Sequence, residues 1–219
     1  MNSIIELSKE YKTMKNILAF GDSNTWGLIP GTKERYPDEI RWTGLVQNKL
    51  NDTKIIEEGL CGRTTVFEDE IRPFRKGVDT LPLILESASP LDGVIIMLGT
   101  NDCKTYYNAN SHIIGKGLER CIEEIEKYVS PEKVLVVSPI HLGDEVWKPT
   151  KDPEFDVDSV NRSKELADTY RRIAEKRGNT FLAASSYASP SKRDDEHLDE
   201  NGHEALATAI TRKIEAMHI

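Results

Sequence analysis

The chain has 219 residues, a formal net charge of −8 and 38% hydrophobic residues. This length and apolar content suffice for one α/β domain with a full core, and they argue against a disordered chain. The acidic balance leaves no basic stripe to displace counterions from nucleic acid or to bind an anionic membrane, so neither is an expected partner.

The N-terminal region lacks an export pattern. Residues 1–13 have no basic start followed by a long apolar stretch, and no apolar run of the chain approaches membrane-spanning length. We expect 1–13 to be an extension, with Met14 as a candidate start, and 14–219 to be a single domain. Three cysteines without CxxC spacing favour neither disulfides nor a zinc site, and they fit a reducing cytoplasm.

Short, continuous apolar runs alternate with helical patterns along the chain. Such runs are typical of strands covered on both faces, and the alternation predicts a parallel sheet with helices on both sides. In chain order, the predicted elements are strand 17–20, helix 42–50, strand 54–56, helix 78–86, strand 94–98, helix 114–129, strand 134–137, helix 160–174, strand 180–183 and a last helix from about 202.

Polar residues follow four of these strands. They lie at 21–27, 58–65, 99–102 and 194–197. Because ligands of open parallel sheets bind at the carboxyl ends of the strands, we expect these loops to converge on one rim. Segment 141–158 is longer than an ordinary connection, which is typical of a binding loop or lid and equally of an exposed excursion.

Ser23 and His197 are the candidate nucleophile and general base. A serine at a strand-to-helix turn exposes its hydroxyl at the mouth of the sheet, although the same position also suits a helix N-cap. Asp194, three residues before His197, can orient the imidazole ring, and Asp195 is an alternative orienting acid. A solvated acidic loop would give the same local pattern.

The other candidates also have structural alternatives. Asn101 can donate its amide to a developing oxyanion and Gly62 can bring a backbone N–H close to a ligand, but both are also common turn residues. Trp26 fits either a substrate pocket or the core. Cys103 has no neighbour that would lower a thiol pKa, and His203, at a helix start, is interpreted as structural.

The order of these residues is more specific than any one of them. The lipase elbow G-x-S-x-G is absent. Gly21-Asp22-Ser23, Gly62, Gly99-Thr100-Asn101-Asp102 and Asp194-x-x-His197 resemble four blocks of the SGNH (GDSL) hydrolase superfamily. The strings GDSNTWG, IIEEGLCGRTT, VIIMLGTNDCK and KVLVVSP resemble its arylesterase–acyltransferase branch, which includes a mycobacterial acyltransferase.

The resemblance implies a fold and a site. The fold is a three-layer α/β/α sandwich of flavodoxin type with a parallel five-stranded sheet. The site is a Ser23, Asp194 and His197 triad, with an oxyanion hole formed by the amides of Ser23 and Gly62 and the side chain of Asn101. No His/Cys/Asp cluster of the sequence has recognisable ligand spacing, so we expect neither a metal nor another cofactor. The branch that the chain resembles tends to form homo-oligomers.

The sequence departs from the family pattern at two places. Asn24 stands where the signature most often has leucine, and the pair Asp195-Glu196 is more acidic than the residues common before the histidine. We expect Asn24 and Trp26 to line the substrate pocket, and the acidic pair to affect the pKa of His197.

These observations predict an esterase or acyltransferase that moves short acyl groups through an acyl-enzyme. Its partners would be a small ester and an acceptor alcohol or water. The alternative within enzymes is a carbohydrate O-acetyl esterase. An alternative of another class is a catalytically silent, flavodoxin-like binding module.

Overall fold

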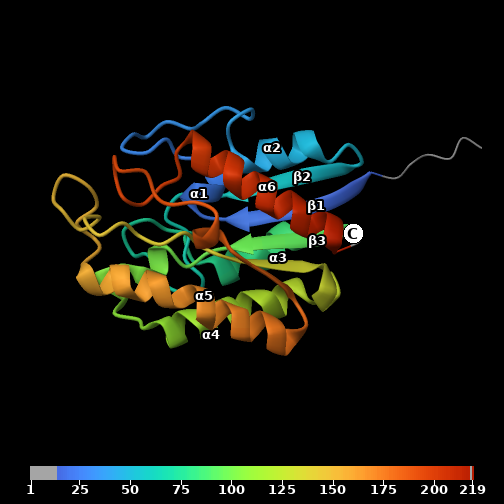
Figure 1. The fold of residues 1–219 in the computed structure, drawn as a ribbon. Helices are drawn as coiled ribbons and strands as arrows, with labels where there is room; N and C mark the ends of the chain where they lie inside the picture. The colour runs from blue at the N-terminus through green and yellow to red at the C-terminus, as the bar shows by residue number, and fades with distance from the viewer. Residues whose placement is uncertain (1–13, 218) are drawn as a thin grey trace, which may run out of the picture.

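A five-stranded parallel sheet forms the centre of the protein, with strand order β2-β1-β3-β4-β5 (Figure 1). The computed structural model describes residues 14–217 and 219, so the proposed extension at 1–13 lies outside the described residues. The predicted three-layer α/β sandwich is confirmed. Its strands are β1 (Lys15–Gly21), β2 (Thr53–Gly59), β3 (Gly93–Met97), β4 (Val134–Ser138) and β5 (Thr180–Ala183).

Helices connect these strands and cover both faces of the sheet. Within the described residues the α-helices are α1 (Ser23–Trp26), α2 (Trp42–Lys49), α3 (Gly77–Ala88), α4 (Ser111–Ile125), α5 (Val157–Arg177) and α6 (Glu200–Ala216). Short 3-10 turns are η1 (Asn101–Cys103), η2 (Thr105–Tyr107), η3 (Pro131–Lys133) and η4 (Ala184–Ser186).

The sheet separates two apolar cores because successive strand side chains point to opposite faces. Leu18 and Phe20 of β1 face the core built with α3, α4 and α5. Ile17 and Ala19 face the core built with α2 and α6. Figure 1 shows these two groups of helices on opposite sides of the sheet.

The last helix begins two residues earlier than its apolar stripe predicts. The Asp199 side chain accepts a hydrogen bond from the backbone N–H of Gly202 at 2.9 Å, which caps α6 and starts it at Glu200. The cap is polar, so hydrophobic periodicity alone does not find it.

In the order β2-β1-β3-β4-β5, the chain adds β2 on one side of β1 and adds β3, β4 and β5 on the other side. The loops after β1 and β3 therefore lie on either side of the switch point between these two strands. Ligands bind at such switch points in open α/β sheets. Gly21 at the end of β1 pairs with Gly59 of β2 and with Met97 of β3, so these three strands end at one level. The loops that leave them therefore start side by side.

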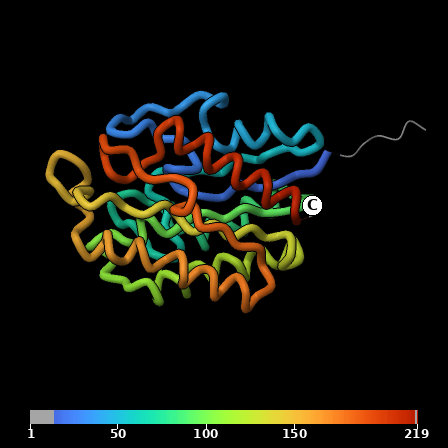
Figure 2. Tube along the Cα trace, in the orientation of Figure 1, coloured from blue at the N-terminus to red at the C-terminus, as the bar shows by residue number. Residues whose placement is uncertain are grey.

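Three segments that are distant in sequence meet at this end of the molecule, as Figure 2 shows. The backbone N–H of Gly31 donates to Asp194 Oδ2 at 2.9 Å. The N–H of Gly143 donates to the carbonyl of Asp195 at 2.8 Å. The loop after β5 is thus held between the loop after α1 and the segment after β4.

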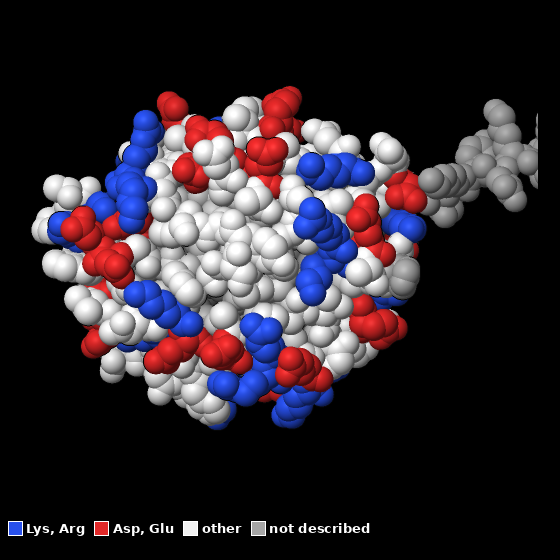
Figure 3. Space-filling view, in the orientation of Figure 1, with Lys and Arg blue, Asp and Glu red and all other residues white. Residues whose placement is uncertain are grey.

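On the face seen in Figure 3, charged side chains of both signs lie around the rim, and the central area has none. Among the described helices, none combines the length and the apolar character that a bilayer crossing requires.

Candidate active site

Ser23 is the first residue of α1, and its hydroxyl points to His197. Ser23 Oγ lies 2.9 Å from His197 Nε2 although the two residues are 174 positions apart. The N-cap of α1 is Asp22, whose carboxylate accepts from the backbone N–H of Asn24 at 3.0 Å. Ser23 is therefore not the cap, and its hydroxyl is available to the imidazole.

Asp194 holds the other side of the ring. Its Oδ2 lies 2.8 Å from His197 Nδ1, and since an ionised carboxylate only accepts, Nδ1 carries the proton and Nε2 is left to accept from Ser23. Asp194 Oδ1 accepts from the backbone N–H groups of Glu196 and His197, both at 3.0 Å. Burial alone would raise the pKa of Asp194, but these hydrogen bonds and the charge of His197 lower it.

The Asn24 side chain links the segment that carries Ser23 to the loop that carries His197. Its Oδ1 accepts from the N–H of Leu198 at 2.9 Å, and its Nδ2 donates to the carbonyl of Glu196 at 3.3 Å. Those two residues flank His197. Asn24 was predicted to line the substrate pocket, but it is only 3% exposed and its amide is used by the protein itself.

The candidate oxyanion donors come from three different loops. The backbone N–H groups of Ser23 and Gly62 donate no hydrogen bond to any residue that the structure describes. Asn101 Nδ2 donates to the carbonyl of Arg63 at 3.1 Å, which leaves its second N–H free, and places the Asn101 side chain against the Gly62 loop. Gly62 has φ +84°, a conformation that favours glycine.

Asp102 joins the same two loops behind the site. Its Oδ1 accepts from the backbone N–H of Thr65 at 2.9 Å and from the hydroxyl of Thr65. The carboxyl is fully buried, and burial raises its pKa to about 6. Asp102 follows Asn101 directly, so this contact fixes the relation between the Asn101 turn and the Gly62 loop.

Negative charge surrounds His197. Glu196 Oε1 lies 3.7 Å from Nε2, and Asp194 and Asp22 also lie close enough to act on the ring. Burial alone would lower the pKa of His197, but the Glu196 charge, the Asp194 hydrogen bond and the Asp22 charge raise it to about 9. The sequence shows Glu196 as a departure from the family pattern, but it does not show that the carboxylate lies beside the base.

Asp195 does not orient the histidine. Its backbone has φ +58°, and its Oδ2 binds Lys151 Nζ at 2.6 Å and the N–H of Glu145 at 3.2 Å. A Cβ added to Gly143 would lie 2.3 Å from the Asp195 carboxyl carbon, so only glycine permits this approach. Of the two acids that the sequence left open, Asp194 contacts the ring.

The segment 141–158 is anchored and is more than an exposed excursion. Val146 and Phe155 are buried, and α5 begins within it at Val157. Its Glu154 carbonyl accepts from the backbone N–H of Thr105 at 2.9 Å, and the Glu154 carboxylate pairs with Lys104. The segment is therefore fixed to the loop after β3 as well as to Asp195.

The remaining candidates lie where the sequence allowed. Trp26 is half-buried, with the Arg35 guanidinium 5.3 Å from its ring. Cys103 is buried, and burial raises the pKa of its thiol. His203 is buried, accepts from the N–H of Trp42 at 3.3 Å, and has a pKa lowered to about 4 by burial.

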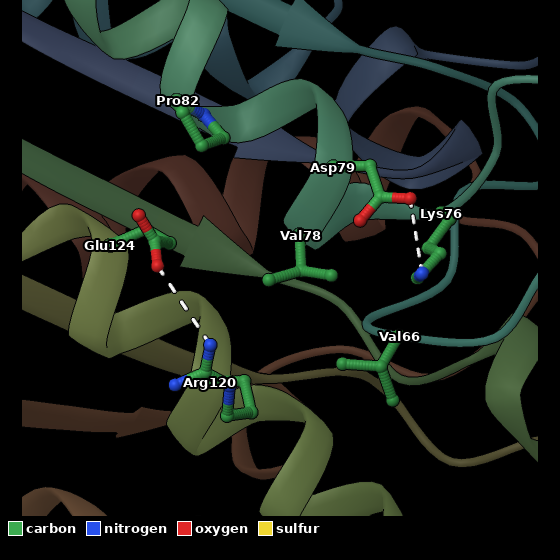
Figure 4. Close-up of a pocket in the computed structure, with 7 residues that line it drawn as sticks. All are labelled: Val66, Lys76, Val78, Asp79, Pro82, Arg120 and Glu124. Carbon is green, nitrogen blue, oxygen red and sulfur yellow. Dashed lines mark ion pairs between the residues drawn. The ribbon is translucent and has the colours of Figure 1, made fainter.

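A surface hollow of about 630 Å³ lies between α3 and α4, away from Ser23 (Figure 4). Val66, Val78 and Pro82 line it together with the ion pairs Lys76–Asp79 and Arg120–Glu124. Its lining includes no serine, cysteine or histidine. The residues that the structure describes include no group of three or more His, Cys, Asp or Glu side chains that could hold a metal ion.

Comparison with known proteins agrees with this geometry. The GDSL-like Lipase/Acylhydrolase family matches residues 19–205. Est24, a carbohydrate acetylesterase from Sinorhizobium meliloti, has 35% sequence identity to this chain. The two structures superpose with a TM-score of 0.84, over 92% of this chain and 99% of that chain. The aryl esterase of M. smegmatis is 32% identical with a TM-score of 0.85, over 93% and 99% of the two chains. No curated protein sequence matches the chain.

Proposed function

Because the chain belongs to the GDSL-like Lipase/Acylhydrolase family and is an esterase, we propose that it transfers short acyl groups from small esters through a covalent intermediate on Ser23. The observation that carries this proposal is the hydrogen-bonded series from Ser23 Oγ to His197 Nε2 at 2.9 Å and from Nδ1 to Asp194 at 2.8 Å. A serine becomes nucleophilic when an oriented base accepts its proton.

The reaction has two steps. Ser23 Oγ attacks the ester carbonyl while its proton moves to His197, and Asp194 stabilises the imidazolium. The carbonyl oxygen becomes negative and accepts hydrogen bonds from the free N–H groups of Ser23 and Gly62 and from the Asn101 amide. The C–O bond to the alcohol then breaks and His197 returns the proton to the alcohol oxygen. Water or a second alcohol attacks the acyl-enzyme by the reverse sequence of proton transfers.

The acceptor decides between hydrolysis and transfer. We propose that an added alcohol competes with water, as the resemblance to the arylesterase–acyltransferase branch implies. The second candidate is a carbohydrate O-acetyl esterase, which the 35% identity to Est24 favours. The silent binding module loses its support, because the matching family and the named structures are of hydrolases.

The test is hydrolysis of p-nitrophenyl acetate by the wild type and by Ser23→Ala, with and without added alcohol. We expect turnover to disappear in the variant, and part of the acyl group to appear as the new ester when alcohol is present. Equal rates in the two proteins would remove Ser23 as the nucleophile. Hydrolysis that depends on Ser23 without any new ester would leave an esterase that does not use the alcohol.

We also propose that the chain acts in the cytoplasm as a homo-oligomer. Three free cysteines fit a reducing compartment. Ile71 and Phe74 are 82% and 76% exposed and lie three positions apart in one loop, and such a pair of apolar residues fits contact with a second copy. Fractionation of cells and light scattering of the purified protein test the two proposals.

A further inference from the structure

Glu196 has a buried carboxylate that the triad does not use. Its side chain is 8% exposed, and Oε1 lies 3.7 Å from His197 Nε2, which is beyond hydrogen-bond distance. Buried carboxylates normally accept hydrogen bonds, so the Glu196 oxygens have capacity to accept from a bound molecule. The backbone of Glu196 is held firmly on both sides, by Asp194 at its N–H and by Asn24 at its carbonyl.

The carboxylate lies on the reacting side of the imidazole ring. Glu196 Oε1 is 3.7 Å from His197 Nε2, the same atom that faces the Ser23 hydroxyl. In the proposed reaction Nε2 gives its proton to the departing alcohol, so the alcohol oxygen must come within about 3 Å of that nitrogen. A substituent next to this oxygen is then within reach of Glu196.

The charges around Glu196 favour a neutral donor over a cation or an anion. Lys104 lies near it: burial alone would lower the pKa of Lys104, but the charges of Glu196 and Asp152 and the Glu154 contact raise it. This positive charge already balances Glu196, so an ammonium group gains little there. An anionic alcohol would meet Glu196, Asp152 and Asp194 together.

We propose that the Glu196 carboxylate determines specificity by accepting a hydrogen bond from a second hydroxyl group on the alcohol part of the ester. The preferred substrates are then monoesters of polyols with a free hydroxyl next to the ester oxygen. The inference rests on the proposed reaction at Ser23. Glu196 takes part in no covalent step: the proton still moves from Ser23 to His197 and then to the departing oxygen.

A hollow next to Lys104 gives the rest of such an alcohol a place to bind. Its volume is about 180 Å³, and its lining combines aromatic rings with carboxylates: Tyr106, Tyr107, Asp69 and Glu154. Aromatic faces beside hydrogen-bond acceptors suit a molecule that has both C–H surfaces and hydroxyl groups.

The experiment compares two esters that differ in one donor, 2-hydroxyethyl acetate and 2-methoxyethyl acetate. Their leaving groups have similar intrinsic reactivity, so the ratio of their kcat/KM values isolates the hydroxyl group. We expect the wild type to prefer the hydroxyl ester by about 10- to 100-fold, the range for a hydrogen bond to a charged group. Glu196→Ala should bring the ratio close to 1, and Glu196→Gln should reduce it to a few-fold.

The ratio also separates specificity from other roles of Glu196. A changed pKa of His197 or a less stable fold alters both rates together and leaves the ratio unchanged. Asp152→Asn is the matched control, because it removes a carboxylate that pairs with Lys104 at 3.7 Å but is not part of the hollow's lining. It should keep the wild-type ratio.

The outcomes distinguish this inference from the proposed function. A wild-type ratio near 1, or a high ratio that persists in Glu196→Ala, would overturn the role of Glu196 while Ser23-dependent hydrolysis of p-nitrophenyl acetate still stands. If the wild type hydrolyses none of the three esters, the proposed function fails and this inference fails with it. If Glu196→Ala does not fold, the wild-type ratio and the nearly isosteric Glu196→Gln still decide.

Discussion

Asn24→Leu introduces the residue most often found at this place in the signature. It should remove the hydrogen bonds that hold the His197 loop against the segment that carries Ser23. The change leaves the buried N–H of Leu198 without its 2.9 Å partner and removes the 3.3 Å bond to the Glu196 carbonyl. An orphaned buried donor and one lost hydrogen bond together cost about 2–4 kcal/mol of unfolding free energy. For a domain of this size the melting temperature falls by roughly 5–15 °C.

The substitution should also slow catalysis, in addition to lowering the free energy of unfolding. Both lost bonds flank His197, and a shift of the base by about 1 Å costs on the order of 100-fold in rate. We would measure kcat on p-nitrophenyl acetate well below the melting temperature, with circular dichroism to confirm that the variant is folded. We expect kcat to drop by about 100-fold.

Asn179→Leu is the matched control for this prediction. Asn179 is also buried, and its Nδ2 donates to Glu126 at 2.9 Å and to the Pro131 carbonyl at 3.0 Å, beside the start of β5 and far from Ser23. It should lower the melting temperature by a comparable amount with kcat unchanged. If Asn24→Leu behaves in the same way as this control, Asn24 does not position the base, and our reasoning is refuted.

Three further predictions concern the site itself. Asn101→Ala should lower kcat by about 100- to 1000-fold without unfolding the protein, because one oxyanion donor is lost; a folded variant with full turnover would contradict the assignment. Since His197 must be neutral to accept the Ser23 proton and its pKa is raised to about 9, kcat/KM should climb with pH and level off above about 9. Glu196→Gln removes the largest contribution that raises this pKa, so its profile should level off at lower pH; identical profiles would mean that the 3.7 Å contact does not act on the base.

Much of the fold was predictable because buried parallel strands have a local signal. All five apolar runs coincide with strands, to within a few residues at their ends. The loops after these strands then follow from the rule for parallel sheets. For the same reason Ser23, Asn101 and His197 could be proposed together from their order along the chain.

The choice of Asp194 over Asp195 came from the family resemblance, because the residues alone left both open. The two residues have the same side chain and adjacent positions, and the difference lies in the backbone. Asp195 has φ +58°, which directs its carboxylate to Lys151, whereas Asp194 faces His197. No local pattern encodes that turn, because it depends on Gly143 approaching from another segment.

The structural contacts of Asn24 could not be predicted for a similar reason. Its partners are 172 and 174 positions away, so nothing near it in the sequence indicates a structural role. A polar residue next to a nucleophile was therefore interpreted as part of the pocket. The role of Glu196 was also hidden, because the sequence shows its charge but not the side of the ring on which it lies.

The dependence of the site on so distant a segment has a consequence for biosynthesis. Translation delivers Ser23 early, but β5 and the loop with Asp194 and His197 come late, with α6 after them, and β3 and β4 separate β1 from β5 in the sheet. A nascent chain that already holds every strand but stops before Asp194 has a nucleophile loop without its base. The site can therefore assemble only after the loop with Asp194 and His197 has reached Ser23, so catalysis depends on contacts between nearly the whole length of the chain.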